Sequence, residues 1–336
     1  MNISIEASTL DIVKDGMILV VGGAGYIGAH LCKQLHHKNY SFIVFDNLST
    51  GHKHFVKWSQ LVIADLNDKT AIESCFNTYP ITAVMHFSAV ANVAESVKNP
   101  QLYYQNNVVN TLNLLEIMIK YEVKTFIFSS TCATYGMPQQ EMLTENHPQS
   151  PISPYGQSKL MVEQIVRDYA IAYHFNYAFL RYFNAAGADN DAEIGESHTP
   201  ETHLIPLAIQ AALDSTKCLT INGKDYDTKD GTCIRDYIHV NDLADAHILA
   251  LDYLQKTKQN LELNLGTGTG HSISDIVTEV ERVSGQKIRV KYGPKRAGDP
   301  PKLVADARLA TKTLGWKPQY TLHQIIQTAL KWHKTQ

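Results

Sequence analysis

A tyrosine and a lysine four residues apart, Tyr155 and Lys159, have the clearest chemical meaning of any residues in this chain. Ser153 and Pro154 precede them as a helix start, because serine can cap the first turn and proline can occupy it. Residues at i and i+4 share one helix face, so the phenol and the ammonium can act on the same proton. A free tyrosine is a poor base at neutral pH, and a nearby positive charge lowers its pKa. The pair therefore predicts proton transfer by Tyr155.

A glycine-rich turn lies upstream, with Gly22, Gly25 and Gly28 between an apolar run and an amphipathic segment. Glycines there let the backbone approach a diphosphate at a helix N-terminus. Asp46 ends the next apolar run, where a carboxylate can accept hydrogen bonds from both hydroxyls of an adenosine ribose. A 2′-phosphate would meet like charge, so NAD is favoured over NADP. Asp65 after the third run could sit beside the adenine; the alternative for either aspartate is a helix cap or a loop role.

A hydroxyl completes the chemistry, since Thr131 follows the apolar run 125–130. Ligands of parallel sheets bind at the carboxyl ends of the strands, so Thr131 would face the same substrate oxygen as Tyr155. The pair alone would more often belong to a solvated helix face. Together with the glycine turn, it predicts hydride transfer to or from a nicotinamide while Tyr155 moves the hydroxyl proton.

The positioning elements follow from alternation of short β-branched runs with amphipathic segments. This alternation predicts an α/β fold with a doubly wound, mostly parallel Rossmann sheet and a smaller, interleaved C-terminal α/β lobe. We expect a Rossmann domain over 17–184 and 233–267, a substrate-binding lobe over 185–232 and 268–336, and an N-terminal extension over 1–16. The expected strands are 17–22, 42–47, 61–65, 83–87, 125–130, 177–184 and 261–265, and the expected helices include 26–39, 101–121, 153–174 and 204–214.

The overall composition limits the kinds of partner that the protein can bind. A net charge of −3 over 336 residues provides no basic field for nucleic acid or an anionic membrane, and charge or glycine interrupts every apolar run. The five cysteines are scattered without a CxxC pair, as expected for reduced thiols. We expect a soluble, cytoplasmic protein that binds small molecules and requires no metal ion.

Beyond these inferences, the chain resembles the extended short-chain dehydrogenase/reductase family, and within it the UDP-hexose 4-epimerases. The similarity runs from Met17 onward. The motifs that carry it are GGAGYIGAH, FDNLSTG, HFSAVANVAES, SSTCATYG, SPYGQSK, LRYFNAAGA, DGTCIRDYIHV and RAGDPPKLVADA. The resemblance implies interconversion of UDP-galactose and UDP-glucose through transient oxidation at C4, with NAD tightly bound and recycled, and it suggests a homodimer. Helices over 101–121 and 153–174 are the expected dimer faces.

The resemblance also implies residue roles. The implied catalytic residues are Thr131, Tyr155 and Lys159. The implied NAD-binding residues are Gly22, Gly25, Tyr26, Ile27, Gly28, Asp46, Asn47, Asp65, Leu66, Phe87, Asn106, Tyr155, Lys159 and Phe183. The implied substrate-binding residues are Thr131, Asn184, His203, Leu204, Arg235, Arg296, Asp299 and Leu303. In this assignment Arg235 and Arg296 neutralise a diphosphate through bidentate hydrogen bonds.

Three positions depart from some members of the family: Ala91 replaces a lysine, His203 an asparagine, and Leu303 a bulky tyrosine that restricts the pocket. The smaller Leu303 would admit UDP-N-acetylhexosamines, although a core-packing role is at least as well supported. A 4,6-dehydratase is the alternative enzyme, but the segment Thr131-Cys132-Ala133 lacks the acidic pair that elimination needs. A non-catalytic NAD-binding scaffold is the alternative outside enzymes.

Overall fold

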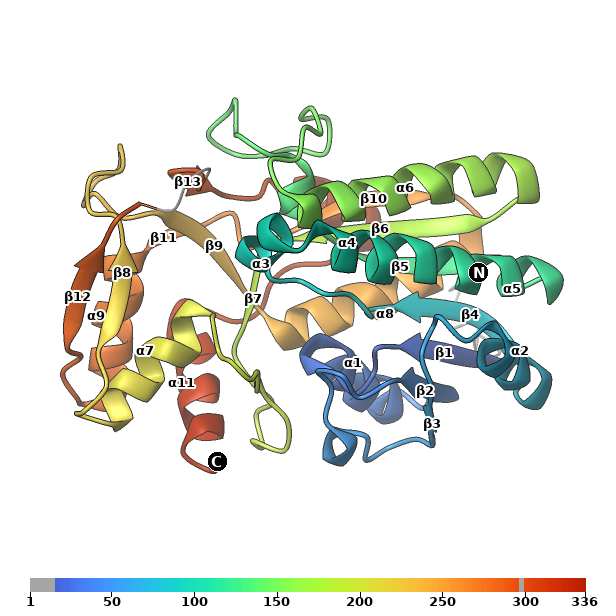
Figure 1. Ribbon diagram of the computed structural model, residues 1–336, viewed down its shortest axis with the longest axis horizontal. Helices are drawn as coiled ribbons and strands as arrows, with labels where there is room; N and C mark the ends of the chain where they lie inside the picture. The colour runs from blue at the N-terminus through green and yellow to red at the C-terminus, as the bar shows by residue number, and fades with distance from the viewer. Residues whose placement is uncertain (1–15, 296–298) are drawn as a thin grey trace, which may run out of the picture.

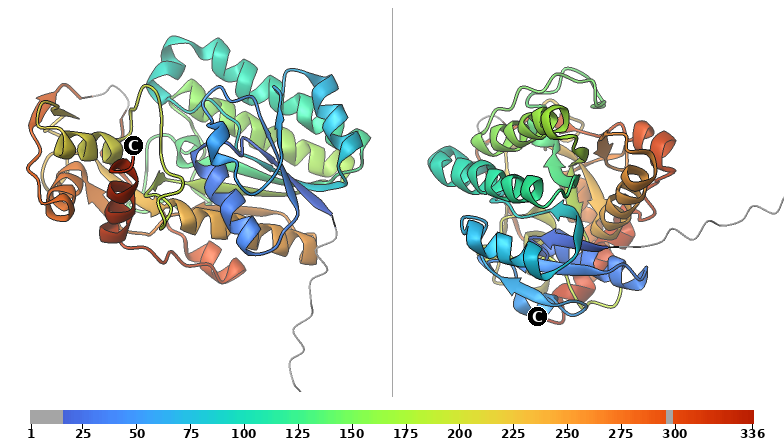
Figure 2. Two further views of the ribbon diagram at one scale, coloured as in Figure 1. Left: turned by 90° about the horizontal axis from the view of Figure 1, so that it is seen from below. Right: turned by 90° about the vertical axis from the view of Figure 1, so that its right-hand side faces the viewer.

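The computed structural model describes residues 16–295 and 299–336, so Arg296 and nearly all of the expected N-terminal extension lie outside the described residues. Figure 1 shows a large sheet with its helices at one end of the molecule and smaller sheets at the other. Figure 2 shows the same division from two further directions.

The large sheet has seven strands, all of whose neighbours are parallel, in the order β10-β6-β5-β4-β1-β2-β3. This order reverses direction beside β1 and confirms the predicted doubly wound fold. Every predicted strand is present, with ends shifted by a few residues. The strands are β1 (Met17–Val21), β2 (Phe42–Asp46), β3 (Leu61–Ile63), β4 (Ile81–His86), β5 (Thr125–Thr131), β6 (Asn176–Tyr182) and β10 (Leu261–Leu265).

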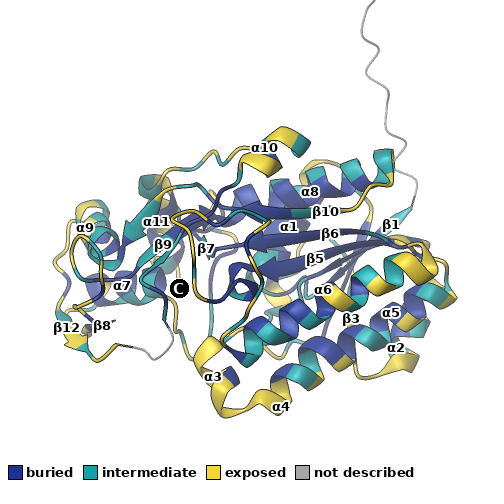
Figure 3. Cartoon of the chain, turned by 90° about the horizontal axis from the view of Figure 1, so that it is seen from above, coloured by how far each residue is buried: buried dark blue, intermediate teal, exposed yellow. Residues whose placement is uncertain are grey.

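Helices cover both faces of this sheet, which explains why its central strands are buried along nearly their whole length rather than at alternate residues. One face packs against α1 (Tyr26–His37), α8 (Val240–Thr257) and α10 (Arg308–Leu314). The other packs against α2 (Lys69–Thr78), α5 (Asn110–Lys120) and α6 (Pro154–Tyr173). Figure 3 shows the buried strands beneath helices whose outer faces are exposed. The two cores hold the strand ends, and hence the site, in fixed positions.

The predicted helix over 101–121 is interrupted in the structure. It consists of α4 (Pro100–Tyr103), a π-helical turn η2 (Tyr104–Val109) and α5, and it follows the short helix α3 (Val93–Lys98). Within the turn, the Asn107 amide bonds to both backbone groups of Val90 and to the Ser158 hydroxyl. These bonds tie the turn to the segment after β4 and to α6.

The smaller unit contains two further sheets. In one, β9 (Ile234–His239) pairs with β7 (Asn184–Ala186), β11 (Gly270–Ser272) and β13 (Lys302–Leu303); in the other, β8 (Leu219–Asn222) pairs with β12 (Val290–Gly293). The helices α7 (Leu204–Leu213), α9 (Ile273–Ser284) and α11 (Leu322–His333) enclose a separate core. None of the described helices combines the length and apolar character needed to cross a membrane.

The position of β9 bears on the division into domains. The range 233–267 was expected in the Rossmann domain, but β9 pairs only with strands of the smaller unit, whereas α8 and β10 pack in the large one. We propose that the chain enters the smaller unit with β7, leaves it at the end of β9, and returns to it after β10.

Candidate active site

The expected catalytic hydroxyls meet at the carboxyl end of the sheet. Thr131 is the last residue of β5, and its Oγ1 accepts a hydrogen bond of 3.1 Å from the Ala133 amide at the start of a 3-10 turn, η3 (Cys132–Thr134). Tyr155 lies in the first turn of α6, which Ser153 caps by accepting from the Gly156 amide. Burial raises the pKa of Tyr155 to about 12, opposed by a hydrogen bond with Thr131.

Lys159 lies one turn further along α6 and is 3% exposed. Its Nζ donates to the Ser129 carbonyl oxygen at 2.8 Å and lies 4.6 Å from the centre of the Phe128 ring. Burial lowers the pKa of Lys159 to about 7, opposed by the charge of Glu163. The expected lowering of the Tyr155 pKa by Lys159 and an oxidised nicotinamide stays a prediction, because in the polypeptide alone burial is the largest influence on the pKa of Tyr155.

A buried ionic network fixes α6 against β5 and β6. The Glu163 carboxylate accepts from the Ser130 hydroxyl at 2.6 Å and from two nitrogens of Arg181 at 2.6 and 2.8 Å. Arg181 also bonds to Glu262 on β10, and Arg167 bridges Glu163 and Glu262. Ser130 immediately precedes Thr131, so the network joins the strand that carries Thr131 to the helix that carries Tyr155 and Lys159.

The glycine turn has the close contacts that a diphosphate site needs. Gly22 has φ of +81°, and a Cβ there would lie 2.5 Å from the Ser88 backbone nitrogen. A Cβ at Gly28 would overlap the carbonyl oxygen of Gly22. Gly25 precedes α1, and among the described residues no side chain caps this helix. Tyr26 opens α1 and donates to the Gly187 carbonyl oxygen, while Ile27 packs into the core. The first amides of α1 therefore suit an anion.

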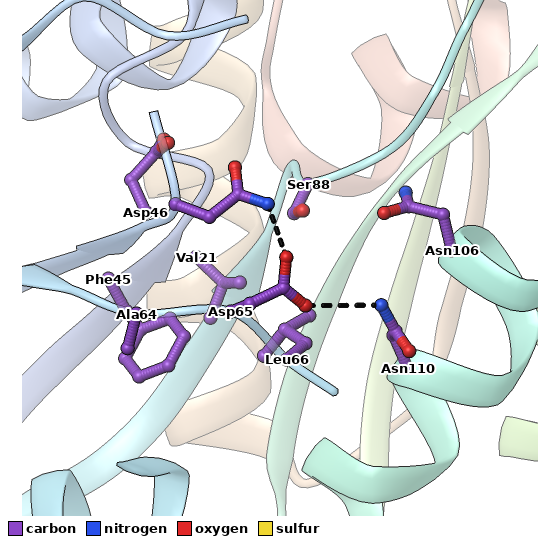
Figure 4. A pocket seen from close by; sticks show the side chains of 10 residues that line it. Val21, Phe45, Asp46, Ala64, Asp65, Leu66, Ser88, Asn106 and Asn110 are labelled. Atoms are coloured by element: carbon purple, nitrogen blue, oxygen red, sulfur yellow. Dashed lines mark hydrogen bonds between the residues drawn. The ribbon is translucent and has the colours of Figure 1, made fainter. Parts of the chain in front are cut away.

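A pocket beside this turn gathers the residues expected at the adenosine. Figure 4 shows the side chains of Asp46, Asp65 and Asn106 around it, and Asn47 also lines it. The Asn47 amide donates to Asp65 at 2.5 Å, and Asn110 donates to the other carboxylate oxygen at 3.4 Å. The full lining is Val21, Phe45, Asp46, Asn47, Ala64, Asp65, Leu66, Ser88, Asn106 and Asn110.

The two aspartates of this pocket do not cap helices. Asp46 accepts from the backbone amides of Ala24 and Leu48, and burial raises its pKa against these two bonds. Asp65 accepts from the Asn67 amide, whereas Asp68 caps α2. Each carboxylate thus supports a loop and also lines the pocket, which is a geometry compatible with binding ribose hydroxyls and an adenine amino group.

The remaining cofactor candidates follow β4 and β6 directly or lie on η2. The Phe87 ring is 4.7 Å from that of His247, and Asn106 on η2 donates to Asn107. Phe183 is buried in a small apolar cluster with Cys132. All three are therefore held at or beside the carboxyl ends of β4 and β6 or on the turn that faces them.

Three substrate candidates come together where the two units meet. Arg235 on β9 donates to Asp299 at 2.6 Å, and Leu303 on β13 is its register partner. Leu303 packs against the cluster that contains Cys132 and Phe183. Burial raises the pKa of Cys132 to about 12, and the Arg235 charge opposes this rise.

The other substrate candidates are divided. Asn184 begins β7 beside Phe183, whereas Leu204 begins α7 and packs into the core of the smaller unit. His203 is the residue before α7 and contacts Glu196 and Glu201. These two glutamates and His198 also form a cluster with His203 that the sequence analysis did not anticipate. The spacing E-x-H-x-x-E-x-H in the sequence is the signal that could have revealed it.

Together, the parallel doubly wound sheet, the open glycine turn and the Thr/Tyr/Lys group define a nicotinamide-dependent short-chain dehydrogenase/reductase. Residues 18–266 match the NAD dependent epimerase/dehydratase family. The chain belongs to this family.

The alignments with similar proteins cover nearly the full length of both chains. A UDP-glucose 4-epimerase of Rhizobium meliloti (strain 1021) is 48% identical over 321 residues, which are 96% of this chain and 98% of that protein. The crystal structure of UDP-glucose 4-epimerase from Brucella ovis in complex with NAD has a TM-score of 0.91 and 48% identity, over 94% of this chain and 98% of that one. The UDP-Glc/GlcNAc 4-epimerase of Campylobacter jejuni has a TM-score of 0.83 and 42% identity, over 95% and 99%.

Proposed function

We propose that this protein is an NAD-dependent UDP-glucose 4-epimerase, which interconverts UDP-galactose and UDP-glucose. The observation that supports the proposal is that Thr131 ends β5 and Tyr155 and Lys159 begin α6, while Leu303, the register partner of Arg235, packs against the cluster that contains Cys132. Proteins of this activity match nearly the whole chain. The match therefore includes the smaller unit as well as the sheet that would bind the cofactor. The enzyme is therefore an isomerase with no net redox change.

The polypeptide contributes the proton transfer. Bound NAD supplies a hydride acceptor that returns the hydride within the same turnover. Tyr155 removes the proton from the sugar 4-hydroxyl and later gives it back, while the Thr131 hydroxyl positions the same oxygen. The raised pKa of Tyr155 means that phenolate forms only beside positive charge, which the oxidised nicotinamide ring would provide and to which Lys159 adds below its own pKa of about 7. Proton removal is thereby coupled to the presence of the oxidised cofactor.

The remaining role assignments rest on position. For NAD, the first amides of α1 would hold the diphosphate, Asp46 and Asn47 the adenosine ribose, and Asp65 and Leu66 the adenine. For the substrate, Arg235 would bind the UDP diphosphate after releasing Asp299, and Asp299 would then accept from the uridine ribose. A firmly bound UDP and a loosely held hexose let the 4-keto sugar present both faces.

The pocket residue Leu303 supports a wider range of sugars. It is partly buried against the cluster that contains Phe183 and Cys132, and it lies opposite Arg235 of β9. Leucine occupies less volume than the tyrosine expected in stricter pockets. We therefore include UDP-N-acetylglucosamine and UDP-N-acetylgalactosamine among the proposed substrates, and the similar protein of Campylobacter jejuni is a UDP-Glc/GlcNAc 4-epimerase.

Dehydration of the sugar is the second candidate, because the family includes dehydratases. Elimination of the C6 hydroxyl needs an acid beside the 4-keto sugar. The residue after Thr131 is Cys132, a buried thiol whose pKa burial raises to about 12, and Ala133 follows. A thiol held neutral to that pH is a poor proton donor, so this geometry favours the epimerase.

The test uses purified protein and UDP-galactose, with products separated by chromatography. An epimerase gives an equilibrium mixture with UDP-glucose and no net accumulation of NADH. A UDP-4-keto-6-deoxyhexose would instead establish the dehydratase. Absence of both products, even with added NAD, would support the non-catalytic scaffold and contradict the proposal. Adding UDP-N-acetylgalactosamine in parallel establishes the sugar range.

A homodimer is the proposed assembly. Large apolar side chains are exposed on the expected faces, including Val109 on η2 and Ile171 on α6, which is 80% exposed. Such side chains on neighbouring helices favour contact with a second copy. We also propose a cytoplasmic location, since all five cysteines are free and four of them are buried, as in proteins of reducing compartments.

A further inference from the structure

Four side chains of one loop converge between β7 and α7. They are Glu196, His198, Glu201 and His203, and one ligand atom of each lies within 4.8 Å of those of the others. Nδ1 of His203 lies 2.8 Å from Glu196 and 2.9 Å from Glu201. Nδ1 of His198 lies 3.5 Å from Glu196 and 3.7 Å from Glu201. All four close pairs thus run between a histidine and a glutamate.

Hydrogen bonding within the protein does not account for this arrangement. A single Nδ1–H of His203 faces two carboxylate oxygens at nearly equal distance, and it can point well at only one. Nδ1 of His198 is fully enclosed, and among the described residues it has no hydrogen-bond partner. A buried polar nitrogen without a partner costs free energy, and an ion is one of its few explanations.

We propose that these four residues bind a divalent transition-metal ion, with Zn²⁺ as the best match. Zinc takes imidazole nitrogen and carboxylate oxygen at about 2.0–2.2 Å, which places tetrahedral ligands about 3.3 Å apart. The four histidine–glutamate distances, from 2.8 to 3.7 Å, surround that value. Mg²⁺ and Ca²⁺ prefer six or more oxygens, so two imidazoles argue against them.

The charge of the site points the same way. Both glutamate side chains are only 7% exposed, whereas those of His198 and His203 are 31% and 53% exposed. Two carboxylates withdrawn from water require compensation by positive charge. A divalent ion bound by both carboxylates would supply this positive charge. The ion would also be bound by the His198 nitrogen that has no hydrogen-bond partner.

The role of the ion is structural, because four protein ligands leave no open position for a substrate. The loop over 187–203 is already attached to the cofactor end of the sheet. Tyr26 donates to the Gly187 carbonyl, His52 bonds to the Ser197 carbonyl, and Trp332 donates to the Glu196 carbonyl. The metal would close this loop locally and hold it beside the glycine turn.

Protonated histidines offer the competing explanation. Burial lowers the pKa of both imidazoles, but the influence of the two glutamates outweighs it and raises the values to about 9 for His198 and about 10 for His203. Two imidazolium groups would balance two carboxylates without any ion. Zinc binding distinguishes the two explanations directly, because an ionic cluster retains no metal.

The experiment uses full-length protein without a histidine tag, loaded with zinc sulfate, dialysed, and analysed by mass spectrometry for metals. We expect one zinc per chain, and cobalt loading should give the strong visible absorption of a tetrahedral site. Glu201→Gln and His198→Gln should each weaken zinc binding by more than the roughly 10–100-fold that loss of an outer-shell partner costs. Magnesium chloride should not compete.

The matched control is His323→Gln, which removes a histidine 2.8 Å from a single glutamate, Glu279, elsewhere on the surface. It should leave the zinc content unchanged. The proposal is overturned if the native protein retains no more than a tenth of a zinc per chain, or if both loop variants retain as much as the native protein. His198 is partly exposed, so its variant keeps the test valid if Glu201→Gln does not fold.

Discussion

At the scale of single residues, the proposed mechanism makes Tyr155 the group on which turnover depends. Tyr155→Phe removes the hydroxyl and keeps the ring that packs edge-on against Tyr103, 6.4 Å between centres. We expect the fold and the bound NAD to be retained and turnover of UDP-galactose to fall by at least the roughly 10²–10⁴-fold assigned to a general base. Steady-state kinetics and the NAD content of the purified variant measure both effects. Activity within tenfold of native would remove Tyr155 from the mechanism.

Lys159 carries a pH effect because burial lowers its pKa from 10.5 to about 7. Between these values the unfolded chain holds a proton that the folded chain does not, so raising the pH stabilises the fold. The gain is about 1.4 kcal/mol per pH unit for one proton. We expect Lys159→Met to lack this pH dependence. The unfolding free energy of the native protein minus that of the variant should therefore rise from pH 7.5 to 9.5. Parallel curves from urea titrations would show that Lys159 has an ordinary pKa.

Leu303 sets the size of the sugar pocket in the proposed function. Leu303→Tyr adds bulk against Phe183 and Cys132. We expect kcat/KM for UDP-N-acetylglucosamine to fall at least tenfold more than that for UDP-glucose, a discrimination of about 1.4 kcal/mol or more. Leu303→Met serves as the control of similar volume and should change both substrates little. Equal losses on both substrates with Leu303→Tyr would assign Leu303 to packing alone.

At the scale of elements, local patterns determined most of the fold. The runs that form β1, β2 and β5 lie between helices on both faces, and such strands are recognisable because nearly every residue is buried. The π-helical turn η2 was missed because its cause is tertiary, namely the bonds of Asn107 to Val90 and Ser158. The pairing of β9 was missed for the same reason, since its partners lie far away in the chain.

The contact between α6 and the sheet can be tested through its buried ion pair. Glu163 is fully buried and Arg181 is 1% exposed. Removing one partner of such a pair costs about 3–5 kcal/mol, and loss of the Glu163 charge would leave Arg181 with Glu262 alone. We expect Glu163→Gln to lower the unfolding free energy by an amount of that order, measured by urea denaturation. Lys229→Ala, which breaks the exposed pair with Asp275, should cost less than about 1 kcal/mol. Similar losses in both variants would contradict a special role for the buried network.

At the scale of the whole molecule, the site exists only because two units meet. The sheet supplies Thr131, Tyr155 and Lys159, whereas β9 and β13 of the smaller unit supply Arg235 and Leu303. The family resemblance predicted all five residues for one site. Spacing in the sequence alone could predict only Thr131, Tyr155 and Lys159. The histidine–glutamate cluster matches no motif of the resemblance. Its spacing in the sequence becomes meaningful only because the loop after β7 folds back and brings the four side chains together.

The whole molecule also offers the last prediction, on its assembly. Val109 on η2 and Ile171 on α6 are 41% and 80% exposed, and contact with a second copy would bury them. We expect light scattering to give about twice the chain mass of 37.6 kDa for the native protein. Val109→Glu combined with Ile171→Glu should shift it toward one chain mass, because each burial is worth about 1.5–3 kcal/mol and a buried glutamate adds a desolvation cost. Tyr292→Glu, on the exposed strand β12 at the other end of the molecule, is the control and should stay dimeric. A native protein of single-chain mass would refute the dimer, and a double variant that remains dimeric would exclude this face.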